Sequence, residues 1–133
     1  MDAPKLTHES VCVLYIEDNP SNIELIEKVA QMIGGFELIT AKSGLEGLEL
    51  IELHKLDLVL LDLHLPDIDG VDVLRKIQSN PETHELPVVI LSADATQNQI
   101  DRMLALGADE YLTKPIDIAK LMSIINSAVA KRR

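Results

Sequence analysis

Acidic, hydroxyl and amine side chains stand at the carboxyl ends of four short apolar segments of this chain. The residues are Glu17, Asp18, Asp62, Ser92 and Lys114. If the segments are strands of one open α/β sheet, their carboxyl ends meet at the edge where such sheets bind ligands. The sequence therefore predicts that three carboxylates, one hydroxyl and one amine converge on a single site.

Three carboxylates in one place repel each other and need compensating positive charge. Two unit charges 4 Å apart repel by about 4 kcal/mol at an effective dielectric constant of about 20. Lys114 supplies one positive charge, so three negative charges and one positive charge leave a sum of −2. A divalent cation would neutralise that sum, and Mg²⁺ prefers one or two carboxylates together with water and phosphate oxygens. The residues therefore predict a metal-assisted phosphate site.

Short runs rich in Val, Ile and Leu alternate along the chain with longer segments of helical period. That alternation is typical of βαβ units and a parallel sheet. The predicted strands are 11–16, 36–41, 56–62, 87–92 and 109–113. Most of them are continuously apolar, as expected when helices cover both faces of the sheet. We predict an α/β fold with a five-stranded parallel sheet.

Capping signals mark the helices between these strands. The first begins with Asn19 as cap and Pro20 in the first helical position, and it stops at Gly34 and Gly35. The other helices are expected at about 43–53, 70–79 and 96–107, and from Asp117 as cap to the end of the domain.

Spacing within the helices predicts finer detail. In the second helix Leu45, Leu48 and Ile51 recur every three residues, so we expect all three to face the core. At the start of the fourth helix, Thr96 and Gln99 have the spacing of a capping box.

The motifs in combination resemble the receiver domain of two-component response regulators, over about residues 11–129. They occur in the family's order and spacing: Glu17-Asp18, then Asp62-Leu63-His64-Leu65-Pro66-Asp67-Ile68-Asp69-Gly70, then Ser92-Ala93, then Tyr111-Leu112-Thr113-Lys114-Pro115. The resemblance implies a flavodoxin-like, doubly wound (βα)5 fold with strand order 2-1-3-4-5. It also implies that Asp62 takes a phosphoryl group from a histidine of a partner kinase or histidine phosphotransfer protein.

The resemblance implies a role for each matching residue of the site. Asp62 would be the nucleophile, Asp18 a direct ligand of Mg²⁺ (or Mn²⁺), and Glu17 a ligand through water. The backbone carbonyl of His64 would be the third protein contact with the metal. Lys114 would pair with the phosphoryl oxygens. Phosphoryl transfer is catalysed mainly by positioning and charge stabilisation, so no general base is required.

Ser92 and Tyr111 are the expected switch residues. Phosphorylation takes Asp62 from −1 to about −2 and adds three acceptor oxygens, which would draw the Ser92 hydroxyl toward them. Tyr111 would then rotate into the space behind Ser92 and change the surface made by the fourth helix, fifth strand and fifth helix. We expect a shift of a pre-existing equilibrium that lets a downstream protein partner dock there. We class the chain as a signalling phosphoacceptor that promotes its own phosphorylation and dephosphorylation, and not as an enzyme.

Other functions share parts of this pattern. A flavin-binding electron carrier has the same fold, but the chain has no Trp and one Phe to stack on a flavin ring. A metal-dependent aspartyl phosphatase would need a second acid two residues after Asp62, where His64 stands. An EF-hand loop fails because Leu65 takes its first position. The remaining alternative is a pseudo-receiver that only docks onto partners, and the intact acid, hydroxyl and lysine set argues against it.

Length and charge narrow the function further. A chain of 133 residues accommodates one domain, which we place at residues 11–130, between a flexible lead-in at 1–10 and a basic end at 131–133. The net charge of −10 opposes binding to phosphate backbones and to anionic lipid. Nucleic acid is therefore not an expected direct partner.

Cysteine usage and hydropathy predict the compartment. The single cysteine, Cys12, forms no internal disulfide and favours a reducing, cytoplasmic setting. The longest unbroken apolar run is far shorter than the roughly 18 residues of a membrane helix, and residues 1–10 lack a signal-peptide apolar region. We expect no membrane insertion.

The segment Leu91-Ser92-Ala93-Asp94-Ala95-Thr96 resembles receivers attached to hybrid histidine kinases, and a stand-alone receiver remains the other possibility.

Overall fold

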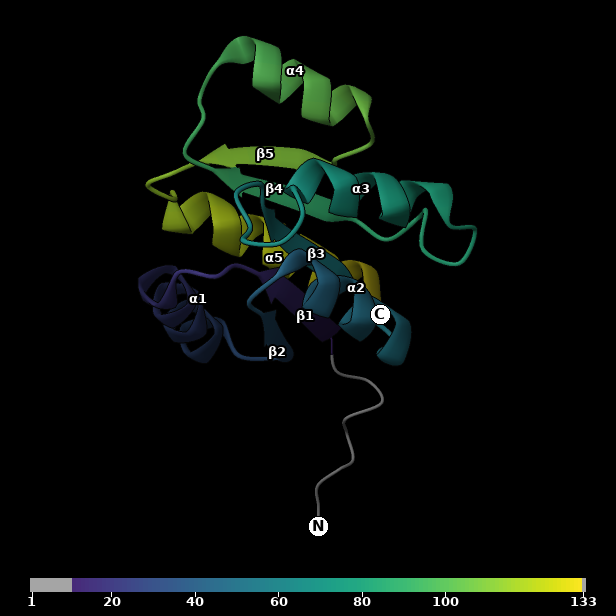
Figure 1. Cartoon of the computed structure of the whole chain (residues 1–133). Coiled ribbons are helices and arrows are strands. Elements are labelled where there is room, and N and C mark those ends of the chain that lie inside the picture. Colours follow the sequence, from purple (N-terminus) through teal and green to yellow (C-terminus); the bar gives the residue numbers. More distant parts are fainter. Residues whose placement is uncertain (1–10, 133) are drawn as a thin grey trace.

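A parallel five-stranded sheet lies between two layers of helices in the computed structural model, which describes residues 11–132 (Figure 1). The strands are β1 (Val11–Ile16), β2 (Phe36–Ala41), β3 (Leu58–Asp62), β4 (Val88–Ser92) and β5 (Glu110–Thr113). The helices are α1 (Pro20–Ile33), α2 (Gly44–Leu53), α3 (Gly70–Ser79), α4 (Gln97–Ala105) and α5 (Ile118–Arg132). The strand order is β2-β1-β3-β4-β5. The predicted fold class and topology are confirmed, while the predicted lead-in at 1–10 lies outside the described residues.

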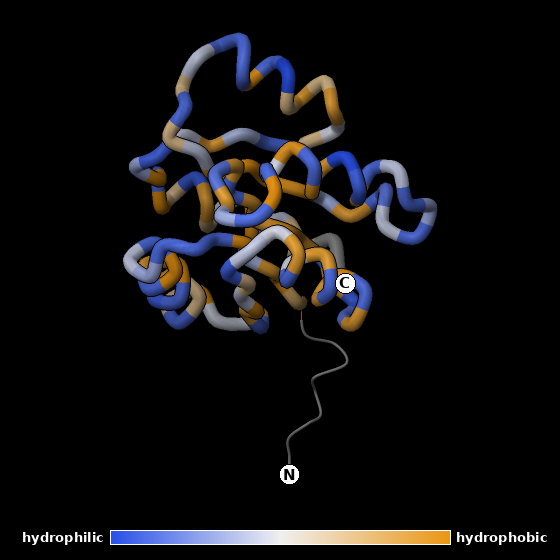
Figure 2. Tube along the Cα trace, in the orientation of Figure 1, coloured by the Kyte–Doolittle hydropathy of each residue, from blue (hydrophilic) through white to orange (hydrophobic). Residues whose placement is uncertain are grey.

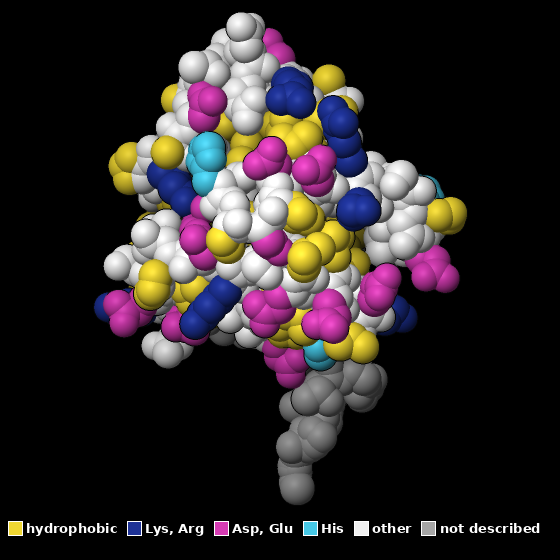
Figure 3. All heavy atoms as spheres, viewed as in Figure 1, with side chains coloured by type: hydrophobic (Ala, Val, Ile, Leu, Met, Phe, Trp, Pro, Cys, Tyr) yellow, Lys and Arg dark blue, Asp and Glu magenta, His cyan; other side chains and the backbone are white. Residues whose placement is uncertain are grey.

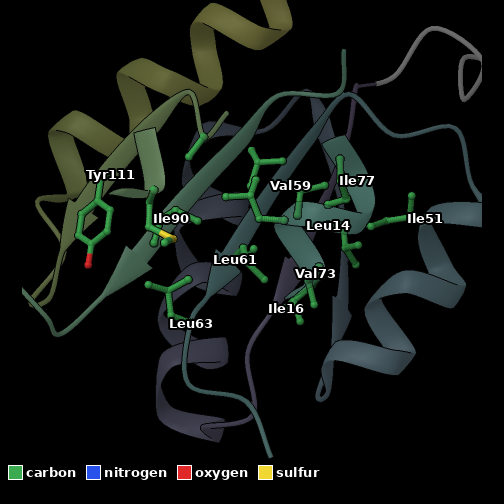
Figure 4. Close-up of a cluster of buried hydrophobic side chains, with 14 of the residues drawn as sticks. Leu14, Ile16, Ile51, Val59, Leu61, Leu63, Val73, Ile77, Ile90 and Tyr111 are labelled. Carbon is green, nitrogen blue, oxygen red and sulfur yellow. The ribbon is translucent and has the colours of Figure 1, made fainter. Parts of the chain in front are cut away.

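Every residue of β1, β3 and β4 is buried, because helices cover both faces of the sheet and successive side chains of a strand point to opposite faces. Leu14 and Ile16 of β1 join a cluster with residues of α2, α3 and α4, part of which Figure 4 shows. Val13 and Tyr15 join the second cluster, with residues of α1 and α5. Figure 2 shows the resulting pattern, with apolar positions along the central strands and polar positions on the outer turns of the helices. Among the described residues, no helix has both the length and the hydropathy needed to cross a bilayer.

Three strands begin one or two residues later than predicted. At two of these starts the side chain of an aspartate accepts one hydrogen bond from the neighbouring strand, while its backbone amide still donates to that strand. The amide of Cys12 donates to the carboxylate Oδ2 of Asp57 (2.8 Å), just before β3 begins. The amide of Val88 donates to Oδ1 of Asp109 (3.0 Å), just before β5. Pro87 has no amide hydrogen to donate, so β4 starts after it.

The prediction that Leu45 faces the core is wrong, since its side chain is 58% exposed. The buried side of α2 consists of Gly44, Gly47 and Ile51. A Cβ atom at Gly47 would collide with the side chain of Ile16, so the helix approaches β1 more closely than any other residue type would allow. The spacing of leucines predicted the wrong buried side because a hydropathy pattern does not identify a glycine as a buried residue.

The helix caps were predicted with mixed success. Asn19 accepts hydrogen bonds from the amides of Ser21 (2.8 Å) and Asn22 (3.2 Å), as expected of a cap. The capping box at Thr96 is wrong, because that side chain makes no cap hydrogen bond. The Thr96 hydroxyl instead donates to Oδ1 of Asp94 at 2.7 Å.

Candidate functional site

The carboxyl ends of β1, β3, β4 and β5 meet at one edge of the sheet and bring the predicted site residues together. Glu17 and Asp18 directly follow β1, and Asp62 is the last residue of β3. One carboxylate oxygen from each of these three residues lies within 4.8 Å of the other two. Glu17 and Asp62 are buried, whereas Asp18 is exposed. The cluster is therefore buried at Glu17 and Asp62 and accessible to solvent at Asp18.

Glu17 is 1% exposed, and while Asp62 is ionised it accepts hydrogen bonds from four donors. Its Oε1 accepts from the Tyr15 hydroxyl (3.0 Å), the Asn22 side-chain amide (3.2 Å) and the Lys114 ammonium (2.9 Å). Its Oε2 accepts from the backbone amide of Asn19 (3.2 Å). These donors fix the direction of the carboxylate.

Asp62 is 4% exposed, and its backbone packs closely against Gly70 at the start of α3. Its Oδ1 accepts a hydrogen bond from the His64 amide (3.1 Å), and its Oδ2 lies 3.4 Å from the Lys114 ammonium. The amide of Gly70 donates to the Leu63 carbonyl (3.0 Å). A Cβ atom at Gly70 would lie 2.6 Å from the Asp62 backbone oxygen. Only glycine fits there, so Gly70 keeps α3 against the backbone that carries Asp62.

The two buried carboxyl groups differ in how readily they ionise. Burial and the neighbouring carboxyl group of Glu17 raise the pKa of Asp62 to about 6. Burial also disfavours the charged form of Glu17, but its hydrogen bonds with Asp62, Lys114 and the Asn19 amide outweigh burial, so the pKa of Glu17 lies below its ordinary value. As pH falls, Asp62 therefore takes up a proton before Glu17 does.

Lys114 spans the two buried carboxylates from the end of β5. It precedes a cis peptide bond to Pro115, and its backbone amide donates to the Ser92 carbonyl (2.8 Å). Its side chain is 20% exposed. Burial lowers the pKa of Lys114, but the carboxylates of Glu17 and Asp62 outweigh that effect and raise it above the ordinary value. The lysine stays charged, and with three carboxylates the group sums to −2.

The donor set fits a hard divalent cation. Three carboxylates with only one compensating lysine leave negative charge that hydrogen bonds alone do not neutralise. Oε1 of Glu17 is filled by three donors, whereas Oε2 has one and keeps a lone pair for a metal-bound water. Asp18 is exposed, so its oxygens can reach a metal directly. The loop that contains His64 begins beside Asp62.

Within residues 11–132, neither Ser92 nor Tyr111 forms a hydrogen bond with Asp62, and both form one with Asp94. The buried Ser92 hydroxyl accepts from the Asp94 amide (3.1 Å), and the Tyr111 hydroxyl donates to the Asp94 carbonyl (2.6 Å). Figure 4 labels the Tyr111 ring beside Ile90, its partner across the sheet. The ring is already buried, so an outward position that precedes rotation is not the one in this structure.

Three residues have roles in or beside the site that were not predicted. Tyr15 and Asn22 bind Glu17. Asp67 accepts from the amides of Gly44 and Leu45, both at 2.9 Å, and so joins the loop after β3 to α2. Hydrogen bonds from backbone amides, that of Leu45 first and then those of Gly44, Ile68 and Asp67 itself, lower the pKa of Asp67 to about 2. Strand alternation, which puts residues i and i+2 on one face, was the available signal for Tyr15.

Comparison with known proteins agrees with this geometry. The family model for the response regulator receiver domain matches residues 13–126. The chain is 32% identical over 115 residues to the polar-differentiation response regulator DivK of Brucella ovis, covering 86% of this chain and 93% of that protein.

Two solved structures show the same likeness. One is the receiver domain of a sensor histidine kinase from Pseudomonas aeruginosa PAO1 with a magnesium ion coordinated in the active-site cleft (TM-score 0.81, 28% identity, 91% of this chain and 98% of that chain). The other is the phosphorylated cyanobacterial phytochrome response regulator RcpA (TM-score 0.75, 31% identity, 89% and 90% covered). The chain belongs to the response regulator receiver domain family.

Proposed function

We propose that Asp62 of this receiver takes a phosphoryl group from a phosphohistidine of a histidine kinase or histidine phosphotransfer protein, with Mg²⁺ or Mn²⁺ held by Glu17, Asp18, Asp62 and the His64 carbonyl. The observation that supports this proposal best is the placement of Asp62. It is a buried carboxylate at a strand end, between a charged lysine and two further carboxylates. The relative solved with a magnesium ion in its active-site cleft supports the choice of metal.

The chemistry follows from the protonation state of Asp62. With a pKa of about 6, the carboxylate is mostly ionised at pH 7 and needs no base. One of its oxygens attacks the phosphorus, a P–O bond forms, the P–N bond breaks, and the electron pair returns to the histidine ring nitrogen. The bound cation would offset charge on the phosphoryl oxygens. Lys114, now 2.9 Å from Glu17 and 3.4 Å from Asp62, turns its ammonium to those oxygens.

Uptake of the phosphoryl group is the expected result when the protein is incubated with Mg²⁺ and acetyl phosphate. Intact mass spectrometry should show one added phosphoryl group on the wild type and none on Asp62→Asn, because an amide is a poor nucleophile. Chelation of Mg²⁺ with EDTA should abolish the gain. If Mg²⁺ demonstrably binds but neither acetyl phosphate nor a phosphohistidine donor adds mass, the chain is a docking module and the proposal fails.

We expect Asp94 to transmit the effect of phosphorylation, because Ser92 and Tyr111 both form hydrogen bonds with its backbone. The Ser92 hydroxyl now accepts from the Asp94 amide, and a phosphoryl group on Asp62 offers it charged oxygens instead. Exchange of that partner frees the Asp94 amide and loosens the segment between β4 and α4. Tyr111 remains bound to the Asp94 carbonyl and passes the movement to the surface of α4, β5 and α5.

Amide hydrogen exchange should report this switch. In the wild type, a steady supply of acetyl phosphate should speed exchange of the Asp94 amide and change exchange in α4. Ser92→Ala should still gain mass but show no phosphorylation-dependent change at Asp94, because the hydroxyl that moves is gone. Tyr111→Ala should keep the change at Asp94 and lose the change in α4. A Ser92→Ala protein whose α4 responds like the wild type would refute the switch.

A downstream protein partner is expected at the α4, β5 and α5 surface, in a cytoplasmic setting. Figure 3 shows acidic side chains scattered among apolar and basic ones over the face viewed. The net charge of −10 opposes direct binding to nucleic acid. Attachment to a hybrid histidine kinase, as in the sensor kinase relative, stays a prediction beside the stand-alone alternative.

A further inference from the structure

The hydrogen bonds to Glu17 are unevenly shared between its two oxygens. Oε1 accepts from three side chains, those of Tyr15, Asn22 and Lys114, while Oε2 accepts from one backbone amide. A carboxylate oxygen offers about two lone-pair sites. Oε1 therefore has one donor more than it needs, and one of the three can leave without exposing an unsatisfied buried charge.

The three donors differ in freedom to move. Tyr15 of β1 is 1% exposed, and its ring packs in one cluster with residues of α1 and α5. Asn22 lies in the first turn of α1, whose backbone is capped by Asn19. Lys114 has a long stem and a partly exposed side chain, and it already approaches a second carboxylate at 3.4 Å. Lys114 is the donor that can leave, and Tyr15 and Asn22 are the donors that stay.

We propose that Tyr15 and Asn22 are positioning residues that hold the Glu17 carboxylate in one orientation while Lys114 moves between Glu17 and the phosphoryl group. This inference rests on the proposed function. Both residues act through Glu17: they fill Oε1, so that Oε2 stays turned toward metal-bound water, and they replace the lysine when it pairs with phosphoryl oxygens. Neither residue touches the phosphoryl group.

Packing of the core does not require the hydroxyl group of Tyr15. A phenylalanine would fill the same space in the core, and burying a hydroxyl costs free energy unless it finds a partner. The hydroxyl finds that partner in Glu17, two residues along the same strand face. Its presence is therefore explained by the carboxylate and not by the core.

Mg²⁺ affinity measured by isothermal titration calorimetry on the unphosphorylated protein tests the inference directly. Removing a group that orients a metal ligand commonly costs about 10- to 100-fold in affinity. We expect Tyr15→Phe and Asn22→Ala each to weaken Mg²⁺ binding about tenfold, because each variant leaves Oε1 with the mobile Lys114 and only one fixed donor. Two donors still satisfy the charge of Oε1, but one fixed donor no longer holds the carboxylate in one orientation. Asn22→Ala keeps the capped helix backbone, so it remains informative if Tyr15→Phe folds poorly.

A matched control separates positioning from stability. Thr83→Val also removes a hydroxyl hydrogen bond, to the Ile77 carbonyl (2.8 Å), but before β4, at the opposite edge of the sheet. It should lower the urea midpoint measured in EDTA and leave Mg²⁺ affinity unchanged. In a Glu17→Gln background, Tyr15→Phe should change Mg²⁺ affinity less than about twofold, because residues that act through one partner are not additive.

Two results would overturn the inference. One is wild-type Mg²⁺ affinity in both Tyr15→Phe and Asn22→Ala, and the other is the same loss of affinity with Glu17→Gln as without it. Either result leaves phosphoryl uptake by Asp62 intact as a proposal. A wild-type protein that binds no Mg²⁺ would instead overturn the metal site and this inference with it.

Discussion

We expect Lys114→Ala to slow phosphoryl uptake by about 100-fold or more and, at the same time, to tighten Mg²⁺ binding. The rate falls because the ammonium beside Glu17 and Asp62 is the residue placed to meet charge on the transferred phosphoryl group. The metal binds more tightly because the carboxylates then sum to −3 without the lysine. Unit charges 4 Å apart interact by about 1 kcal/mol even in water, and a divalent ion doubles that to about 2 kcal/mol, so a gain of about 30-fold is expected.

Opposite signs make this prediction specific. Damage to the site would lower both quantities, whereas loss of one positive charge lowers the rate and raises the affinity. Uptake is measured by intact mass against time with acetyl phosphate, and affinity by calorimetry. Lys120→Ala removes an exposed lysine on the neighbouring helix α5 and should change neither. Uptake at the wild-type rate in Lys114→Ala would show that the lysine does not serve the transfer.

Neutralising the phosphoacceptor should stabilise the protein. Burial and the carboxyl group of Glu17 raise the pKa of Asp62 from 3.8 to about 6. One pKa unit is worth about 1.4 kcal/mol, so the ionised Asp62 costs about 3 kcal/mol at neutral pH. Asp62→Asn keeps the acceptor for the His64 amide and removes the charge. We expect its unfolding free energy at pH 7, in EDTA, to exceed that of the wild type by about 2 to 3 kcal/mol.

The sign of the pH dependence follows from linkage. An acid whose pKa is higher in the folded state binds its proton more tightly there, so this contribution to stability is lost as pH rises from about 4 to about 6. The difference between Asp62→Asn and the wild type should therefore be small near pH 4 and reach a plateau above pH 6. Saturating Mg²⁺ should shrink it, because the metal compensates the charge of the wild type only.

Urea unfolding at several pH values measures this difference. Asp69→Asn is the matched control, because Asp69 is exposed and its side chain makes no cap hydrogen bond to α3. That variant should stay within about 0.5 kcal/mol of the wild type at every pH. A destabilised Asp62→Asn at pH 7 would mean that the carboxylates are already neutralised without a metal.

The fold and the convergence of charged groups could be predicted because each left a local signal. The strands read as apolar runs, and Asp62 ends one of them, a place where a carboxylate is rare without a partner. The orientation of α2 left no such signal. Gly44 and Gly47 face the core because they lack side chains, and they turn Leu45 outward.

Hydrogen-bond partners were harder to predict than positions. The Thr96 hydroxyl was free to cap α4, but Asp94 lies nearby and binds it instead. Tyr15 read as one more apolar residue in a strand, although its hydroxyl reaches Glu17. Such choices depend on distances of a few tenths of an ångström between side chains, which residue spacing does not contain.

Locating the phosphoryl group tests the central claim most directly. Borohydride reduces an acyl phosphate to an alcohol, so a phosphorylated aspartate becomes homoserine and is found by mass spectrometry of peptides. After incubation of the wild type with Mg²⁺ and a phosphohistidine donor, we predict homoserine at position 62 and at no other aspartate. Homoserine at position 18, or a phosphoryl group retained on a histidine or serine, would contradict the assignment of Asp62 as the phosphoacceptor.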